Sequence, residues 1–154
     1  MIAHITVPVK NYLRAKKLYV AALKPLGYKL TMDMPQWKAG GFKEGGHTSF
    51  WIAQKPRMVP GHVALLAKSK VAVQKFYTAA RRNGAKDNGK PGFRPDYGPT
   101  YYAAFVLDHD GNNIEACYFG ERAPAQKVKK VVKKTASKKR AAPKAKKAKK
   151  KTRR

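Results

Sequence analysis

The sequence predicts an α+β domain made of two copies of one β-α-β-β-β unit, followed by a basic tail. Short runs with β-branched residues alternate with two amphipathic helical patterns, which is typical of mixed α and β structure. Sliding the chain by 58 positions places His4 on His62 and Lys17 on Lys75, at corresponding strand and helix positions. Such self-similarity indicates an internal duplication. The composition then changes sharply near Ala123.

The first copy begins with a strand over residues 2–9, and Asn11 then stands where a helix N-cap would. The predicted helix has an apolar face, and Pro25 and Gly27 end it. That face consists of Tyr12, Ala15, Leu18, Tyr19, Ala22 and Leu23. Glycine and proline separate three further strands, over residues 28–32, 37–42 and 48–53.

The second copy repeats this order. A strand over residues 61–67 precedes Ser69, the predicted N-cap of a helix that ends at Asn83-Gly84. Residues 87–99 are rich in glycine and proline and predict a long loop, which is often a functional feature. Strands follow over residues 101–107 and around Glu115, and Asp108–Asn113 has the composition of the tight turn between them.

Three residues with metal-ligand chemistry lie within otherwise apolar strands: His4, His62 and Glu115. A buried carboxylate is costly unless a cation, a metal or hydrogen-bond donors compensate it. Two imidazoles and a carboxylate suit Zn, Ni, Mn, Co or Fe(II). The alternative is that each histidine is an ordinary core or surface residue. The repeat favours a shared site, because equivalent strands direct His4 and His62 toward one axis.

Four segments resemble the vicinal oxygen chelate superfamily, and more narrowly its glyoxalase/bleomycin resistance/dioxygenase-type members. They are Ala3-His4-Ile5, residues 22–28, Gly61-His62-Val63-Ala64 and residues 101–116. The resemblance covers residues 1–120, with modules at about 1–56 and 60–120. It implies paired βαβββ modules that form an open, barrel-like mixed sheet around the site.

The resemblance also implies a divalent metal ion (Fe, Mn, Zn or Ni) held by His4, His62 and Glu115. Glu115 would be a ligand or a catalytic base. The family's fourth ligand position falls on Phe50, which cannot bind a metal; this departs from glyoxalase I and is compatible with the dioxygenase pattern. The implied function is a metal-dependent lyase or dioxygenase acting on a small molecule with vicinal oxygens. The alternative is a non-catalytic, bleomycin-resistance-like binding module.

Aromatic and basic residues supply the predicted substrate contacts. In the loop, Phe93, Arg94 and Tyr97 are candidates, and Arg94 could hold a substrate carboxylate with two hydrogen bonds. A solvated loop arginine is the competing interpretation. Phe50 and Tyr101 are the candidates on strands, where alternation allows only every second residue to line a cleft.

A single cysteine, Cys117, leaves no disulfide framework and favours a reducing, cytoplasmic setting. The N-terminus lacks the layout of a signal peptide, and no apolar run is long enough to span a bilayer. We therefore expect a soluble protein that acts on a small molecule. The sequence leaves open whether it forms a homodimer.

The composition of residues 121–154 predicts a disordered, positively charged segment. The segment up to Arg122 carries a net charge of +11 and the remainder +16, with all eight acidic residues in the first part. In composition the tail resembles those of linker histones, and we expect non-specific nucleic-acid binding and association with a nucleoid or nucleus. Its densest part contains Lys144, Lys146, Lys147, Lys149, Lys150 and Lys151. A nuclear localisation signal, a membrane tether and a solubilising tail are the alternatives.

Overall fold

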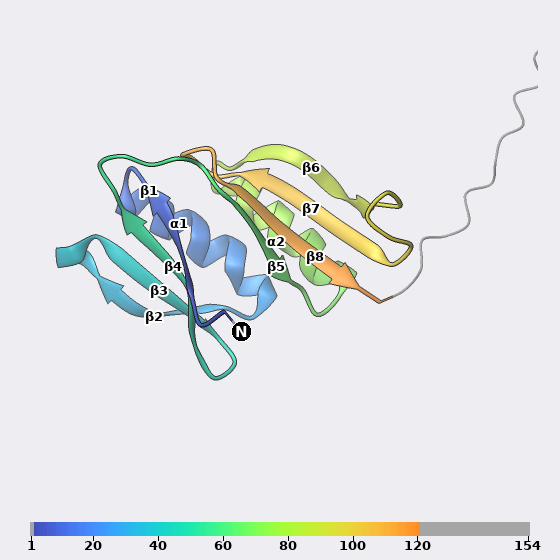
Figure 1. The fold of residues 1–154 in the computed structure, drawn as a ribbon, viewed down its shortest axis with the longest axis horizontal. Coiled ribbons are helices and arrows are strands. Elements are labelled where there is room, and N and C mark those ends of the chain that lie inside the picture. The colour runs from blue at the N-terminus through green and yellow to red at the C-terminus, as the bar shows by residue number, and fades with distance from the viewer. Residues whose placement is uncertain (1, 121–154) are drawn as a thin grey trace, which may run out of the picture. The chain divides into compact units, whose positions relative to one another are not determined.

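The computed structural model describes residues 2–120, and the predicted basic tail at 121–154 lies outside the described residues. Two modules with the same element order make up this part of the chain (Figure 1). The first contains β1 (Ile5–Val9), α1 (Tyr12–Leu23), β2 (Lys29–Met34), β3 (Ala39–Glu44) and β4 (His47–Gln54). The second contains β5 (His62–Leu66), α2 (Lys70–Arg82), β6 (Lys86–Phe93), β7 (Tyr101–Leu107) and β8 (Asn113–Phe119). Two single 3₁₀ turns, Lys24–Leu26 and Pro35–Trp37, flank β2.

Each module forms its own four-stranded mixed sheet. The strand orders are β1-β4-β3-β2 and β5-β8-β7-β6. The first strand pairs in parallel with the last strand of its module, and the remaining pairs are antiparallel. The predicted α+β class and the two βαβββ modules are therefore confirmed.

The second helix is followed by a strand where the sequence predicted a loop. Residues Lys86–Phe93 form β6, and only residues 94–100 connect it to β7. The prediction was wrong because glycine and proline were taken as strand breakers. β6 lies at the edge of its sheet, where a proline is tolerated, and its pairing with β7 is interrupted at Gly89 and Gly92.

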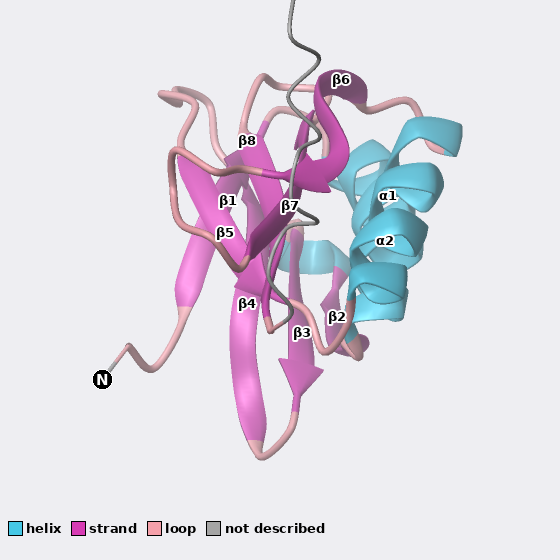
Figure 2. Cartoon of the chain, turned by 90° about the vertical axis from the view of Figure 1, so that its right-hand side faces the viewer, coloured by secondary structure: helices cyan, strands magenta, loops and turns pink. Residues whose placement is uncertain are grey.

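Both helices begin at the predicted caps. The side chain of Asn11 accepts a hydrogen bond from the Arg14 amide at 2.9 Å, and Ser69 Oγ accepts one from the Ala72 amide at 3.1 Å. The two helices pack on the same side of the sheets (Figure 2). The main core lies between the helices and the sheets, and its largest buried side chains include Tyr19, Phe42 and Phe76.

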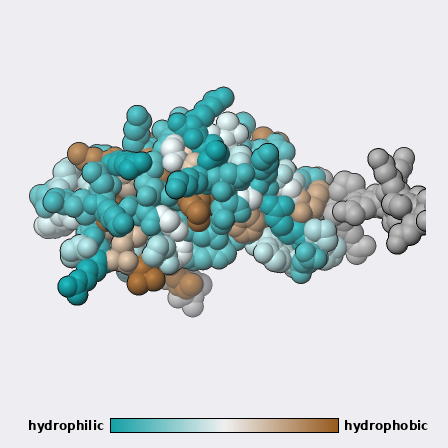
Figure 3. Space-filling view, turned by 90° about the horizontal axis from the view of Figure 1, so that it is seen from above, coloured by the Kyte–Doolittle hydropathy of each residue, from teal (hydrophilic) through white to brown (hydrophobic). Residues whose placement is uncertain are grey.

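The face seen in Figure 3 is mainly hydrophilic, with apolar residues in small patches. Among residues 2–120, no helix has both the length and the apolar character needed to span a membrane.

One buried turn between β7 and β8 connects the modules. Asp108 is 5% exposed, and its carboxylate accepts four hydrogen bonds, from the amides of Asp110 and Asn112, the Tyr19 hydroxyl and the Asn112 side-chain amide. Burial and the nearby Asp108 carboxylate raise the pKa of Tyr19, so its hydroxyl remains a donor across the neutral range. Asn112 also donates to the Pro8 carbonyl at 3.0 Å and accepts from the Gly61 amide at 3.0 Å. The turn thus joins β1, α1 and the start of β5.

We predict that Asn112→Ala lowers the free energy of unfolding by about 2–4 kcal/mol, because it leaves buried polar groups without partners. Chemical denaturation would measure the change. The control is Asn88→Ala, which removes one exposed side-chain hydrogen bond and should cost less than about 0.5 kcal/mol. Equal unfolding midpoints for the two variants would contradict the role of the turn.

Candidate functional site

The second sheet has two chemically different faces. On β8, Ile114 and Ala116 face the helices and belong to the main core. Glu115 and Cys117 face the opposite side, which we call the open face. Parallel pairing of β5 with β8 places Ala64 opposite Glu115, and His62 two residues before it on the same face. Strand alternation therefore brings His62 and Glu115 together.

The Glu115 carboxylate is fully compensated although it is only 2% exposed. The Tyr101 hydroxyl donates to Oε1 at 2.5 Å, and His62 Nε2 lies 3.0 Å from Oε2. Tyr101 packs against a small buried cluster on the same side of the sheet that includes Ala103 and Cys117. Two protein donors thus offset the cost of burying this charge.

The geometry of the pair defines a histidine tautomer. A carboxylate only accepts hydrogen bonds, so Nε2 of His62 carries the proton that bonds Glu115. A neutral His62 then keeps the lone pair on Nδ1. The His62 side chain is 53% exposed whereas that of Glu115 is 3% exposed, so the imidazole is the accessible member of the pair.

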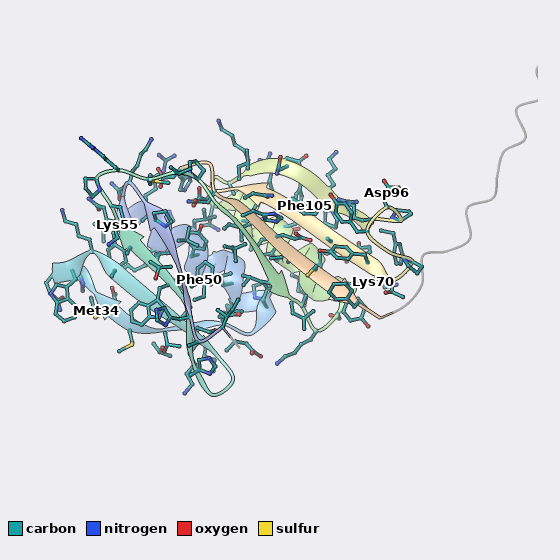
Figure 4. All side chains as sticks on the ribbon, in the orientation of Figure 1. Met34, Phe50, Lys55, Lys70, Asp96 and Phe105 are labelled. Atoms are coloured by element: carbon teal, nitrogen blue, oxygen red, sulfur yellow. The ribbon has the colours of Figure 1, made fainter. Side chains whose placement is uncertain are left out.

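Phe105 and Arg94 extend the site along the open face. The Arg94 guanidinium lies 5.4 Å from the Phe105 ring centroid, and the His62 ring lies 6.3 Å from the same ring. Arg94 is anchored by hydrogen bonds to the Lys90 carbonyl at 2.6 Å and the Phe93 carbonyl at 3.2 Å. Figure 4 shows Phe105 on the second sheet.

Glycine in β6 makes this packing sterically allowed. A Cβ on Gly89 would lie 2.8 Å from Phe105 Cδ2, and one on Gly92 would lie 3.0 Å from Arg94 Nη1. Both distances are shorter than ordinary carbon contacts. The glycines that obscured the strand in the sequence thus allow Arg94 and Phe105 to approach the sheet.

Three aromatic rings line the other end of the open face. Tyr101 contacts Tyr97 edge to face at a centroid distance of 5.3 Å and Phe119 at 4.8 Å. Tyr97 is 65% exposed. Tyr101 therefore joins the aromatic row to the Glu115 carboxylate.

Two predicted substrate contacts lie on the other side of the sheets. Phe50 is 1% exposed and packs against Tyr19, Tyr28 and Phe42 in the core of the first module (Figure 4). Phe93 packs edge to face on Tyr102, with the Lys70 ammonium 5.2 Å from its ring centroid. Neither ring belongs to the open face.

The predicted equivalence of Phe50 with Glu115 is wrong by one residue. Thr6 pairs with Trp51, whereas Ala64 pairs with Glu115, and the repeat places Thr6 on Ala64. Trp51 is thus the structural counterpart of Glu115. A one-residue shift moves a side chain to the opposite face of a strand. The conclusion that this position lacks a metal ligand holds for Trp51 as well.

His4 precedes β1 and is exposed. It lines a cavity of about 350 Å³ that also contacts His62, Ile5 and Ala64. However, residues 2–120 contain no group of three histidine, cysteine, aspartate or glutamate side chains arranged to hold a metal. His62 and Glu115 provide two adjacent donors, and both Glu115 oxygens are already hydrogen-bonded within the protein. The donor set predicted for a metal is therefore incomplete in this arrangement.

The sequence interpretation missed Phe105 as a site residue, because an aromatic in a strand was assigned to the core by default. Counting by two from Tyr101 through Ala103 would have placed it on the face that carries Glu115. The predicted nucleic-acid contacts, from Lys144 to Lys151, lie outside the described residues.

We predict that Tyr101 titrates abnormally. Burial, and then its hydrogen bond to Glu115, raise the pKa of Tyr101 well above the ordinary value of 10.0. Tyr101→Phe should therefore leave the tyrosinate absorbance change near that pH equal to that of the wild type. An unfolded chain releases this proton near pH 10.0, so the stabilisation from a neutral Tyr101 is lost as the pH rises beyond that value.

Glu115→Gln serves as the comparison, because removing the carboxylate should let Tyr101 ionise at a lower pH than in the wild type. If Tyr101→Phe showed one tyrosinate equivalent less than the wild type near pH 10.0, Tyr101 would titrate normally and the prediction of a raised pKa would be wrong.

Comparison with known proteins identifies the family to which this chain is similar. The model of the Glyoxalase/Bleomycin resistance protein/Dioxygenase superfamily matches residues 1–116. No curated protein sequence matches the chain.

Solved structures agree with the family match. A glyoxalase/bleomycin resistance protein from Albidiferax ferrireducens T118 is 25% identical, with a TM-score of 0.65 over 77% of this chain and 98% of that chain. A lactoylglutathione lyase from Agrobacterium tumefaciens is 16% identical, with a TM-score of 0.58 over 77% and 92% of the two chains. A putative glyoxalase from Bacillus halodurans is 19% identical, with a TM-score of 0.58 over 77% and 95%. The last two similarities support the fold alone.

Proposed function

Because this chain belongs to the glyoxalase/bleomycin resistance protein/dioxygenase superfamily, we propose that its open face binds a small molecule and transfers a proton with His62. The observation that carries the proposal is the chain of contacts from Tyr101 through buried Glu115 to half-exposed His62. Buried carboxylates that orient an accessible imidazole are typical of general bases.

Each residue has a defined role in this proposal. Glu115 holds the His62 ring and stabilises the imidazolium that forms when Nδ1 takes a proton. Tyr101 fixes the other carboxylate oxygen. Arg94 offers a guanidinium near the same Phe105 ring and would hold an anionic group of the substrate. The favoured substrate is therefore a small carboxylate with an acidic C–H next to a carbonyl.

The metal-dependent lyase or dioxygenase expected from the resemblance requires more ligands than this arrangement supplies. The ion would need Glu115 to release a protein donor, and a third ligand to approach His62. We therefore assign no step of the proposed proton transfer to a metal.

We predict that the full-length protein accelerates exchange of the methyl protons of pyruvate in deuterium oxide, followed by proton NMR. Pyruvate is the simplest probe with both the carboxylate and the acidic C–H. His62→Gln should lower the exchange rate by about 100-fold or more, because a positioned general base contributes about that much. Arg94→Gln should raise KM more than it lowers kcat, since it acts on binding.

His47→Gln is the matched control, because His47 is exposed at the start of β4 and distant in the pairing scheme from Glu115. Unchanged exchange in His62→Gln would reject the general base. Exchange that disappears with a chelator and returns with Zn, Mn or Fe(II) would instead favour the metal-dependent alternative. In that case His4→Ala should also lower the rate.

A non-catalytic binding module is the second candidate. The row formed by Tyr97, Tyr101 and Phe119 favours it, because edge-packed rings offer a surface on which a planar ligand can lie without reaction. Ligand binding that survives His62→Gln, in a protein without exchange activity, would support this alternative.

We further propose that residues 121–154 tether the domain to nucleic acid. The support is compositional, since residues 123–154 contribute +16 of the total charge of +27. A polycation releases counterions from the phosphate backbone, so binding should be independent of sequence and steeply salt-dependent.

We predict that deleting residues 123–154 weakens binding to duplex DNA by at least about 100-fold at low salt, since many phosphate contacts are lost. Fluorescence anisotropy over a salt series would measure the affinity. An unchanged dependence on salt after the deletion would exclude the tether.

A further inference from the structure

The outer face of the two helices carries cations at repeated positions. Lys17 lies on α1, and Lys24 follows seven residues later, directly after the helix. Lys75 and Arg82 lie at the same spacing on α2. The offset of 58 relates Lys17 to Lys75 and Lys24 to Arg82. At 1.5 Å per residue, the two cations of each pair are about 10 Å apart along the helix.

These four cations, which we call the helix-face cations, are exposed and have no carboxylate partner among residues 2–120. Neighbouring lysines differ: Lys16 pairs with Asp33 at 2.9 Å, and Lys68 pairs with Glu44 at 3.0 Å. Neither α1 nor α2 contains an acidic residue. All charged side chains of the two helices are therefore basic, and the neighbouring carboxylates Asp33 and Asp87 interact with helix residues other than the helix-face cations.

The face also has a hollow with hydrogen-bonding side chains. A cavity of about 260 Å³ is lined by Gln74, Lys75, Thr78, Ala79 and Arg82. An amide, a hydroxyl and two cations are the side-chain groups that contact phosphate oxygens in nucleic-acid complexes. The helices lie next to each other on the same side of the sheets (Figure 2). Helical periodicity places Lys17 and Lys24 opposite the buried side chains of α1, so we expect them on the same outer face as the hollow.

We propose that this helix face binds the phosphate backbone of nucleic acid, as a second contact surface besides the tail. The proposal rests on folded residues and is independent of the small-molecule site, which lies on the opposite side of the second sheet. Binding should not depend on base sequence, because the contacts go to phosphates.

Nucleic acid fits this face better than a membrane surface does. Helices that bind the membrane interface present a continuous apolar face with aromatic residues. Here the exposed large apolar residues of the two helices are Leu13, Val20 and Val71, and no aromatic side chain of either helix is among them. The tail adds further cations within the same chain.

Photo-crosslinking of the full-length protein tests the proposal at the hollow. Thr78→Cys would carry a thiol-linked photo-crosslinker, because Cys117, the one native cysteine, is buried. Gln36→Cys is the matched control, since Gln36 is exposed in the turn between β2 and β3. A duplex DNA of mixed sequence should crosslink at position 78 at least several-fold more efficiently than at position 36. Equal yields would overturn the proposal.

A charge-matched pair of variants tests the energetics in the full-length chain. Lys17→Gln, Lys24→Gln, Lys75→Gln and Arg82→Gln are combined in one protein. The control combines Lys29→Gln, Lys38→Gln, Lys43→Gln and Lys55→Gln, four exposed positions outside α1 and α2. The plot of the logarithm of the DNA-binding constant against the logarithm of the salt concentration has a negative slope. The first variant should reduce the magnitude of that slope by about 3 to 4, because each phosphate contact contributes about 0.9.

The two variants should have equal unfolding midpoints, so that the comparison reports binding. Equal slopes in the two variants would overturn the proposal, because the loss would then reflect total charge alone. A helix-face variant that keeps the DNA slope but loses binding to vesicles of phosphatidylcholine and phosphatidylglycerol would also overturn it, in favour of a membrane surface.

Discussion

One buried carboxylate organises the turn of the second module that meets β1, α1 and the start of β5. Asp108 accepts four hydrogen bonds, and Asn112, which supplies two of them, also bonds Pro8 and Gly61. A buried carboxylate without donors is strongly destabilising, and three of the four donors lie within the turn itself. The fourth, the Tyr19 hydroxyl, comes from α1, and Asn112 bonds the Pro8 carbonyl of β1. The same turn therefore satisfies its own buried charge and contacts the first module.

The candidate site uses the duplicated scaffold asymmetrically. Both modules place a side chain on the open face at the same step of the last strand, Trp51 in the first and Glu115 in the second. Only the second has the Tyr101 and His62 donors beside it. The first module contributes the Tyr19 hydroxyl to the Asp108 turn, and the second module carries the residues of the proposed proton transfer.

Most of the fold could be predicted from the sequence because its signals are local. The N-caps at Asn11 and Ser69 and the apolar face of α1 follow from short-range patterns. The β6 strand could not be predicted, because the edge position that tolerates Pro91 is a property of the assembled sheet. His62 and Glu115 were predicted by residue type as metal ligands together with His4, and their direct contact is seen only in the structure. The bond from Tyr101 depends on strand register and packing. The shift from Phe50 to Trp51 also depends on strand register, which the offset of 58 does not define for the last strand of each module.

The absence of strand pairing between the two sheets means that other contacts join the modules. Among the described strands, β1 pairs only with β4 and β5 only with β8. The modules meet through hydrogen bonds of the β7–β8 turn with Pro8 and Lys10, through the Lys68–Glu44 ion pair and through the packing of α1 on α2. The cavity lined by His4 and His62 therefore takes its shape from both modules. The contacts among Tyr101, Glu115 and His62 lie within the second module alone. Substitutions in the first module can therefore change the cavity wall without removing any contact of that group.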